Sequence, residues 1–213
     1  MRRYDDDLRA ARRIATKQYR TLLAVDDLVG RLFRKLGRLD ERGNTLAFFL
    51  SDNGYLWAEH RVINKRMPYE PSVRLPMFVR WPDTIPAGTT DERLVATVDI
   101  APTVLEAAGL IDEAASLDGR SLLTTPPRSR LVLEFFREAG VRAWASTRTE
   151  GYQYIEWYED DGTVAFREYY DLEGDPWQRR NTLHDGDRTN NPETSSLSAV
   201  LSTDRGCFGP GCP

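Results

Sequence analysis

The sequence is poor in cysteine, and both cysteines lie in its last seven residues, at Cys207 and Cys212 in CFGPGCP. Two thiolates without a neighbouring histidine or further cysteine are too few for a structural zinc site. A disulfide across the short loop between them is the alternative that stays open. The surrounding segment is polar and rich in turn-forming residues, so we expect a disordered tail over 186–213 with no catalytic role.

Long apolar runs and an excess of basic charge are lacking as well. No segment reaches the ~18 apolar residues that a membrane-spanning helix requires. The first residues, MRRYDDD, include two arginines but no apolar stretch after them, which argues against a secretory signal peptide. The formal net charge of −4 at pH 7 argues against nucleic-acid binding through a basic face. We therefore expect neither a nucleic-acid nor a membrane partner.

The sequence does contain enough material for a folded core. It has 213 residues, of which 40% are hydrophobic, with five tryptophans and nine tyrosines. This length suits one large domain or one medium domain with a smaller appendage. Between residues 5 and 39, apolar side chains recur at three- and four-residue steps, which indicates a helix. The pattern fits one long helix or two helices with a break near Asp26.

The first 125 residues read as an α/β unit. The run TLAFFL at 45–50 does not alternate, so we expect a strand buried on both faces, as in the middle of a parallel sheet. LPMFVR at 75–80 is a weaker strand, and its proline suggests an edge or a first-residue position. Residues 98–109 read as a short helix, with Asp99 as the N-cap and Gly109 at its end.

The pattern changes after residue 125. Four short segments rich in aromatic and branched residues follow one another and predict antiparallel strands, at 131–135, 141–147, 152–158 and 164–170. The acidic turn EDDG at 159–162 predicts a hairpin loop between the last two. We therefore expect a second unit over 126–185, joined to the first at TTPPRSR.

The polar stretch SDNG at 51–54 directly follows the strand predicted at 45–50. Asp-Asn-Gly is a strong turn signal, and a surface turn is its structural interpretation. Ligands of α/β proteins, however, bind where the strands end, and oxygen atoms such as those of Asp52 and Asn53 suit Ca²⁺ or Mg²⁺. Two oxygen ligands are too few for a full coordination shell, so a metal there needs other partners. His60 and Lys65 add a proton donor and a fixed cation, which together suit an anionic group.

The segment FFLSDNGYLWAEHRVINKRMPYEPSVRLPMFVRWP at 48–82 closely resembles the C-terminal half of the type I sulfatases of the alkaline phosphatase superfamily. Further stretches agree in the same order, at 19–45, 94–110, 117–123 and 169–181. The resemblance covers about residues 19 to 185. It implies an α/β fold, with part of an alkaline-phosphatase-like sheet flanked by helices, followed by a small antiparallel β subdomain.

The resemblance also implies roles for particular residues. Asp52 and Asn53 match ligands of a Ca²⁺ ion, sometimes Mg²⁺, that holds the sulfate oxygens. Lys65 matches the lysine that contacts the sulfate and steadies the leaving oxygen, and His60 stands where many members carry a pocket histidine. The substrate would be a sulfated small molecule or a sulfated carbohydrate. Three further matching positions read as structural: Arg74, Asp99 and Asp171.

The family nucleophile is missing from this sequence. In these enzymes it is a formylglycine made from the first residue of Cys/Ser-x-Pro-x-Arg. No cysteine or serine heads that pattern here, and TTPPR at 124–128 has the spacing but begins with threonine. The family's N-terminal acidic ligands precede the helix, whereas the acidic run at 5–7 reads as a solvated helix N-terminus. We interpret the chain as the C-terminal part of a sulfuric ester hydrolase, inactive alone, with the missing N-terminal half of the fold as a partner.

Two other interpretations stay open. One is a phosphonate or phosphodiester hydrolase of the same superfamily, because phosphoryl and sulfuryl groups present similar oxygens to a metal. Asn53 favours sulfate, since members that act on phosphate more often have histidine there. The other is a non-catalytic remnant or a binding module, which the absent nucleophile allows.

Overall fold

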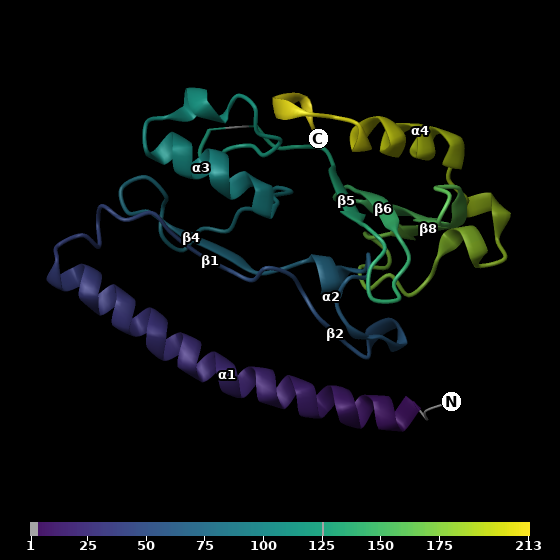
Figure 1. Cartoon of the computed structure of the whole chain (residues 1–213), viewed down its shortest axis with the longest axis horizontal. Coiled ribbons are helices and arrows are strands. Elements are labelled where there is room, and N and C mark those ends of the chain that lie inside the picture. The colour runs from purple at the N-terminus through teal and green to yellow at the C-terminus, as the bar shows by residue number, and fades with distance from the viewer. Residues whose placement is uncertain (1–3, 125) are drawn as a thin grey trace. The chain divides into compact units, whose positions relative to one another are not determined.

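The computed structural model describes residues 4–124 and 126–213 (Figure 1). The chain forms two compact units. The first holds the chain through Lys65 together with Pro71–Thr90, and the second holds Arg66–Glu70 and Asp91–Pro213. Residues 91–124 thus group with the later part of the chain, whereas the sequence pattern places them with the first 90 residues.

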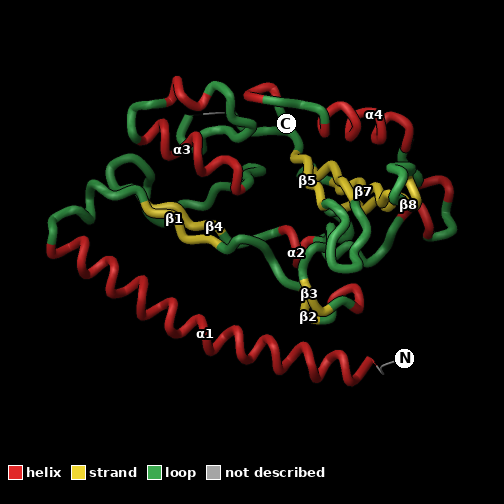
Figure 2. The backbone as a smooth tube through the Cα atoms, in the orientation of Figure 1, coloured by secondary structure: helices red, strands yellow, loops and turns green. Residues whose placement is uncertain are grey.

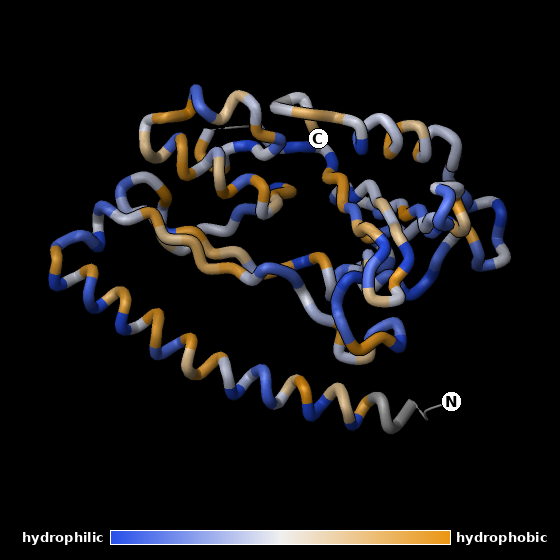
Figure 3. The backbone as a smooth tube through the Cα atoms, in the orientation of Figure 1, coloured by the Kyte–Doolittle hydropathy of each residue, from blue (hydrophilic) through white to orange (hydrophobic). Residues whose placement is uncertain are grey.

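The first unit begins with one unbroken helix, α1 (Tyr4–Arg38), so the alternative of a break near Asp26 is wrong. Lys35 and Arg38 lie in its last turn, where positive charge suits the helix dipole. Apolar and charged residues alternate along it (Figure 3). Ala11 is buried, whereas Leu23 is 70% exposed. No helix of the described residues is long and apolar enough to cross a bilayer.

Strand β1 (Ala47–Leu50) pairs antiparallel with β4 (Met77–Arg80), in a register that runs from Ala47↔Arg80 to Leu50↔Met77. The expected parallel pairing is therefore wrong for the described residues. Burial on both faces is wrong too, because Phe49 and Phe78 are 45% and 64% exposed and contact each other on one face. An apolar run reports which residues could be buried, but it carries no information on the direction of the neighbouring strand.

A small hairpin follows β1 and lies in the same unit. Leu56 pairs with Asn64 and is fully buried. Trp57 Nε1 donates a hydrogen bond to Gln18 Oε1 at 2.6 Å, which ties the hairpin to α1. The elements of this region are β2 (Leu56–Trp57), the 3-10 turn η1 (Glu59–Arg61), β3 (Ile63–Asn64) and the single helical turn α2 (Glu70–Val73).

The second unit begins with a short helical region in which Asp99 does more than the sequence predicts. Asp99 precedes α3, but its carboxylate makes no cap hydrogen bond to that helix. It accepts hydrogen bonds from the backbone N–H of Ala96 at 2.7 Å and of Arg120 at 2.8 Å, and it pairs with Arg128 at 2.6 Å. The prediction of a helix cap is thus incomplete, because the carboxylate also binds Arg120 and Arg128, which lie more than twenty residues away in the sequence. The elements are η2 (Thr97–Asp99), α3 (Ile100–Ala107) and η3 (Ile111–Ala114).

A four-stranded antiparallel sheet forms the rest of the core, in the order β5-β6-β7-β8. The four predicted strands are confirmed within a few residues, as β5 (Leu131–Phe135), β6 (Trp144–Arg148), β7 (Tyr152–Tyr158) and β8 (Val164–Asp171). Gly162 has a positive φ of 82° in the predicted hairpin loop. Asp171 accepts hydrogen bonds from two backbone N–H groups just after β8, as expected of a turn former.

The expected disorder of residues 186–213 is wrong. Helix α4 (Thr194–Arg205) lies in this segment (Figure 2). Glu193 is its N-cap, and the side chain of Glu193 accepts hydrogen bonds from two backbone N–H groups. Leu201 on α4 is fully buried in a cluster with Ala145 and Tyr154 of the sheet. Short turns surround the helix, namely η4 (Thr182–His184), η5 (Arg188–Asn190) and η6 (Gly209–Gly211). A few apolar side chains thus hold a largely polar segment against the sheet.

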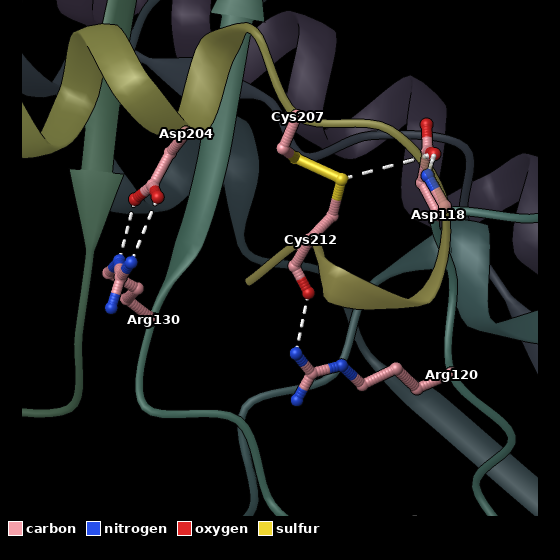
Figure 4. The surroundings of a disulfide bond; sticks show 7 residues. Asp118, Arg120, Arg130, Asp204, Cys207 and Cys212 are labelled. Atoms are coloured by element: carbon pink, nitrogen blue, oxygen red, sulfur yellow. Dashed lines mark hydrogen bonds and ion pairs between the residues drawn. A yellow bond between two sulfur atoms is a disulfide. The ribbon is translucent and has the colours of Figure 1, made fainter.

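A disulfide between Cys207 and Cys212 closes the loop after α4, so the structure selects the disulfide among the alternatives for these thiols (Figure 4). The loop is docked at two further points. Arg120 donates a hydrogen bond to the carbonyl of Cys212 at 2.5 Å, and the N–H of Gly209 donates to Asp118 at 2.7 Å. Figure 4 shows these contacts beside the Arg130–Asp204 ion pair, whose two hydrogen bonds are 2.6 and 2.9 Å long.

Candidate functional site

The candidate site starts in the loop that leaves β1. The carboxylate of Asp52 accepts a hydrogen bond from the backbone N–H of Asn53 at 2.9 Å. Ser51 Oγ donates to the carbonyl of Asn53, also at 2.9 Å. These short-range bonds form the turn that Asp-Asn-Gly predicts. They leave the second carboxylate oxygen of Asp52 and the side-chain carbonyl of Asn53 for contacts with other parts of the chain.

Lys65 makes those contacts. Its Nζ lies 2.7 Å from Oδ1 of Asn53 and 3.7 Å from Oδ2 of Asp52. The hairpin explains this proximity, because the pairing of Leu56 with Asn64 returns the chain to the point where it left the loop. The side chains of Lys65 and Asp52 are 39% and 81% exposed, so the site is open to solvent. The structure thus brings three of the four predicted site residues together, while their chemical roles stay a prediction.

Gly54 fixes the loop against α2, and sequence reasoning assigned it no role beyond the turn. Its N–H donates a hydrogen bond to the carbonyl of Ser72 at 2.9 Å. A Cβ atom at this position would lie 2.1 Å from the carbonyl oxygen of Pro71, well inside the contact distance of real atoms. Only glycine therefore allows this close approach of two backbone segments.

His60, the fourth predicted residue, lies in η1 at the closed end of the β2–β3 hairpin. Its backbone is left-handed, with a φ of 49°. The contacts among Asp52, Asn53 and Lys65 form at the open end of the same hairpin. The hairpin register thus separates the histidine from the lysine, and its role as a pocket histidine stays a prediction.

The donor chemistry of the site fits a hard cation. Ca²⁺ and Mg²⁺ prefer carboxylate, carbonyl and water oxygens, and Asn53 Oδ1 already accepts a hydrogen bond from the ammonium group of Lys65. The donor number is low, because Ca²⁺ takes about six to eight oxygen ligands. Within residues 4–124 and 126–213, no three His, Cys, Asp or Glu side chains gather as a metal-binding group. Asp52 and Asn53 could therefore supply only part of a coordination shell.

Comparison with known families places these residues in context. The sequence model of the sulfatase family matches residues 1–110. The model described as "N-sulphoglucosamine sulphohydrolase, C-terminal" matches residues 58–203. The two matches overlap over residues 58–110, which include Lys65, and each covers more than half of the chain.

Curated relatives agree with these matches. The chain is 33% identical over 173 residues to an N-acetylglucosamine-6-O-sulfatase of Bacteroides thetaiotaomicron, a match that covers 76% of this chain and 30% of the relative. It is 31% identical over 233 aligned positions to the human N-acetylglucosamine-6-sulfatase, which covers 92% of this chain and 41% of that protein. The chain thus spans less than half the length of these relatives.

Solved structures support the α/β fold. A protein solved in complex with its substrate D-glucosamine-2-N,6-O-disulfate is 29% identical, with a TM-score of 0.75 over 87% of this chain and 39% of that one. A phosphonate monoester hydrolase of Agrobacterium radiobacter is 27% identical, with a TM-score of 0.68 over 84% of this chain and 38% of that one. The predicted fold class is thereby confirmed. From the family matches, the relatives and the fold together, the chain belongs to the sulfatase family.

Proposed function

We propose that the complete protein hydrolyses sulfate esters of a carbohydrate and that this chain supplies the sulfate-binding end of the site. One observation carries the proposal: Lys65 Nζ lies 2.7 Å from Asn53 Oδ1, in the loop after β1 of a sulfatase-family chain. An ammonium group held beside a carboxylate and an amide oxygen can bind one side of an oxyanion while a cation binds the other. The fold alone would not support this assignment, since related folds host different reactions.

Each residue has a proposed role. Asp52 and Asn53 would hold Ca²⁺, or Mg²⁺, through their side-chain oxygens, and the bound cation would supply positive charge to the sulfate oxygens. Lys65 would donate hydrogen bonds to a sulfate oxygen and stabilise the charge that develops on the leaving oxygen. We keep His60 as a proposed proton donor of the pocket, to be tested separately because it lies at the other end of the hairpin.

The nucleophile would come from another part of the fold. No cysteine or serine of the sequence heads Cys/Ser-x-Pro-x-Arg, the pattern from which the family forms its formylglycine. Relatives continue for more than half of their length beyond the share that this chain matches. We propose that the polypeptide corresponding to that remainder completes both the nucleophile and the coordination shell. The chain alone is then expected to turn over no sulfate ester.

A sulfated carbohydrate is the proposed substrate class. The relatives at 33% and 31% identity are named N-acetylglucosamine-6-sulfatases. The structural neighbour with a TM-score of 0.75 was solved with a sulfated glucosamine. The phosphonate alternative has neighbours of the same fold, but Asn53 with Lys65 is the arrangement that the resemblance to sulfatases implies.

Three assays test the proposal. The purified chain is incubated with Ca²⁺ and p-nitrocatechol sulfate beside the Asp52→Ala variant, and turnover above this variant would contradict the missing nucleophile. In the completed protein, 6-sulfated glucosamine and a phosphonate monoester are compared at equal concentration. Faster phosphonate hydrolysis would favour the alternative. Calcium titration by calorimetry distinguishes the proposed metal site from a non-catalytic remnant. A remnant would bind Ca²⁺ no better than its Asp52→Ala variant does, whereas a chain with the proposed site should lose affinity in that variant.

A further inference from the structure

The segment that follows Lys65 is held by the four-stranded sheet through its backbone. Trp144 Nε1 donates a hydrogen bond to the carbonyl of Arg66 at 2.9 Å. Gln153 Nε2 donates to the carbonyl of Pro68 at 2.8 Å, and Gln153 is fully buried. Both donors come from strands of the sheet, so each carbonyl has a fixed partner more than seventy residues away in the sequence.

Glu70, at the end of the same segment, is bound through both its backbone and its side chain. Its N–H donates to Gln178 Oε1 at 2.6 Å, and Gln178 Nε2 donates to Gln153 Oε1 at 2.5 Å. Arg148 Nε donates to the carboxylate of Glu70 at 2.8 Å. Glu70 and Gln178 are only 7% and 1% exposed. We call Glu70, Arg148, Gln153 and Gln178 the anchor network.

The candidate site is attached to both ends of this anchored segment. Lys65 precedes Arg66 by one peptide bond. At the other end, α2 joins Glu70 to the backbone of Pro71 and Ser72, against which Gly54 of the loop after β1 is packed. One short stretch of chain is therefore joined to the lysine on one side and to the backbone that packs against this loop on the other.

The polar character of the anchor network suits a positioning role. Apolar packing tolerates small shifts, whereas a buried hydrogen-bond network is stable only when each partner keeps its place. Lys65 ends in a flexible four-carbon stem and is 39% exposed, so its own packing does little to fix it. Oxyanion sites are sensitive to displacements of about 1 Å, which makes the backbone that carries the lysine important.

We propose that the anchor network consists of positioning residues that hold Lys65 at Asn53. The inference rests on the proposed function for its purpose, because the contact between these two side chains is the proposed sulfate-binding end. It extends that function by giving the hydrogen bonds of residues 66–70 a role in placing the lysine that directly precedes them. The hydrogen bonds described above join the four residues to one another and to residues 66–70, so their proposed action on Lys65 runs through that segment.

The chain offers a direct probe, because it contains only three lysines, at 17, 35 and 65. Reductive methylation with ¹³C-formaldehyde gives each a dimethylammonium signal that keeps its charge and one N–H. The Lys65→Arg variant assigns the signal of Lys65. Lys17 and Lys35 are exposed on α1 and serve as internal references. The separation of the Lys65 signal from theirs measures its contact with Asn53.

The test compares two disruptive variants with two controls in the full chain. Glu70→Gln and Arg148→Met disrupt the ion pair of the anchor network, while Arg148→Lys keeps the positive charge at position 148. Glu156→Gln makes the same substitution as Glu70→Gln at another buried glutamate of the sheet, which hydrogen-bonds Tyr154 and Tyr158 instead. We expect the first two variants to move the Lys65 signal toward the reference signals, and the two controls to leave it in place.

Several results would overturn the inference. It fails if the Lys65 signal stays in place in Glu70→Gln and Arg148→Met, if Glu156→Gln moves it equally, or if it overlaps the references in the unaltered chain. Should these variants not fold, Trp144→Phe removes the hydrogen bond to the carbonyl of Arg66 while it keeps an aromatic ring beside Phe135, and an unmoved signal there also contradicts the inference.

A calcium titration of the same proteins separates this inference from the proposed function. If the chain binds no Ca²⁺ but the signal responds as expected, the positioning role stands and the proposed metal site fails. If Asp52→Ala abolishes Ca²⁺ binding but the signal ignores the anchor variants, the metal site stands and the positioning role fails.

Discussion

At the scale of single residues, the site depends on the absence of a side chain at Gly54. Gly54 lies where a Cβ would meet the carbonyl oxygen of Pro71 at 2.1 Å, and neither atom can rotate away, because the Cβ is fixed to its Cα and the oxygen belongs to the backbone. Gly54→Ala should therefore displace the loop and destabilise the fold by about 1–3 kcal/mol, as overpacking does elsewhere. It should also weaken the contact between Lys65 and Asn53.

Urea unfolding measures this cost. The matched control is Gly43→Ala, because a Cβ at Gly43 meets no atom within 4 Å. We expect this control to leave the free energy of unfolding unchanged or slightly higher. Equal stability of the two variants would show that the loop and α2 are not packed as described.

A second residue-scale prediction concerns the buried pair of Asp99 and Arg128. Their side chains are 1% and 3% exposed, and the carboxylate also accepts two backbone hydrogen bonds. Arg128→Ala leaves that carboxylate buried without its counter-charge, so we expect a loss of about 3–5 kcal/mol in the free energy of unfolding. Arg142→Ala is the control, because Arg142 pairs with Glu159 in solvent and such pairs contribute only about 0–1 kcal/mol. Similar costs in urea unfolding would contradict the burial of the first pair.

At the scale of elements, neighbouring strands β7 and β8 carry two glutamates whose pKa values move in opposite directions. Burial raises the pKa of Glu168, and hydrogen bonds such as that from Trp157 only partly offset it. For Glu156 burial also acts upward, but hydrogen bonds from Tyr154 and other hydroxyls and the charge of Arg167 outweigh it, so its pKa falls below the usual value. The same sheet thus stabilises one carboxylate and penalises the other.

The sign of the pH dependence follows from these directions. Glu156 contributes stability above its unfolded pKa, and this contribution is lost as the pH falls through its lower folded pKa. Glu168 contributes stability below its unfolded pKa and loses it as the pH rises through its raised folded pKa. From about pH 3 to pH 7, Glu156→Gln should therefore become more costly and Glu168→Gln less costly, relative to the unaltered chain. Urea unfolding at both pH values checks this, and parallel trends for the two variants would contradict the assignment.

The loop after α4 supports a further prediction at this scale. The bond between Cys207 and Cys212 closes a loop with a sequence separation of 5, and chain entropy predicts that such a short loop contributes about 2 kcal/mol. Cys207→Ser should lower the free energy of unfolding by about this amount. Reducing agent should destabilise the unaltered chain similarly and leave the variant unchanged. An effect of the reductant on the variant would point to another cause.

The elements also show what the sequence could and could not predict. The strands of the antiparallel sheet were visible because aromatic and branched residues cluster between turn signals. Helix α4 was hidden in a polar stretch, since its burial depends on Leu201 meeting Ala145, more than fifty residues away in the sequence. The same limit applies to the site. Asp52, Asn53 and Lys65 lie just before and just after one short hairpin and could be grouped from spacing, whereas Glu70 and Gln178 are 108 residues apart and gave no local signal.

At the scale of the whole molecule, the first unit leaves much apolar surface in solvent. Leu23 and Leu28 on α1 are 70% and 58% exposed, and Phe78 on β4 is 64% exposed. Its two described sheets have two strands each, whereas isolated two-stranded sheets are marginally stable. The chain spans less than half the length of the relatives described above.

The uncovered surface leads to a prediction for the chain alone. Exposed apolar patches of this kind promote association, so we expect the purified chain to self-associate as its concentration rises. Leu23→Glu should weaken that association in sedimentation velocity, because it places a charge within the apolar surface. Ala24→Glu adds the same charge on exposed α1 and should change association less, since alanine contributes little apolar area. If both variants weakened association equally, net charge would control the self-association, and the apolar surface of α1 would not.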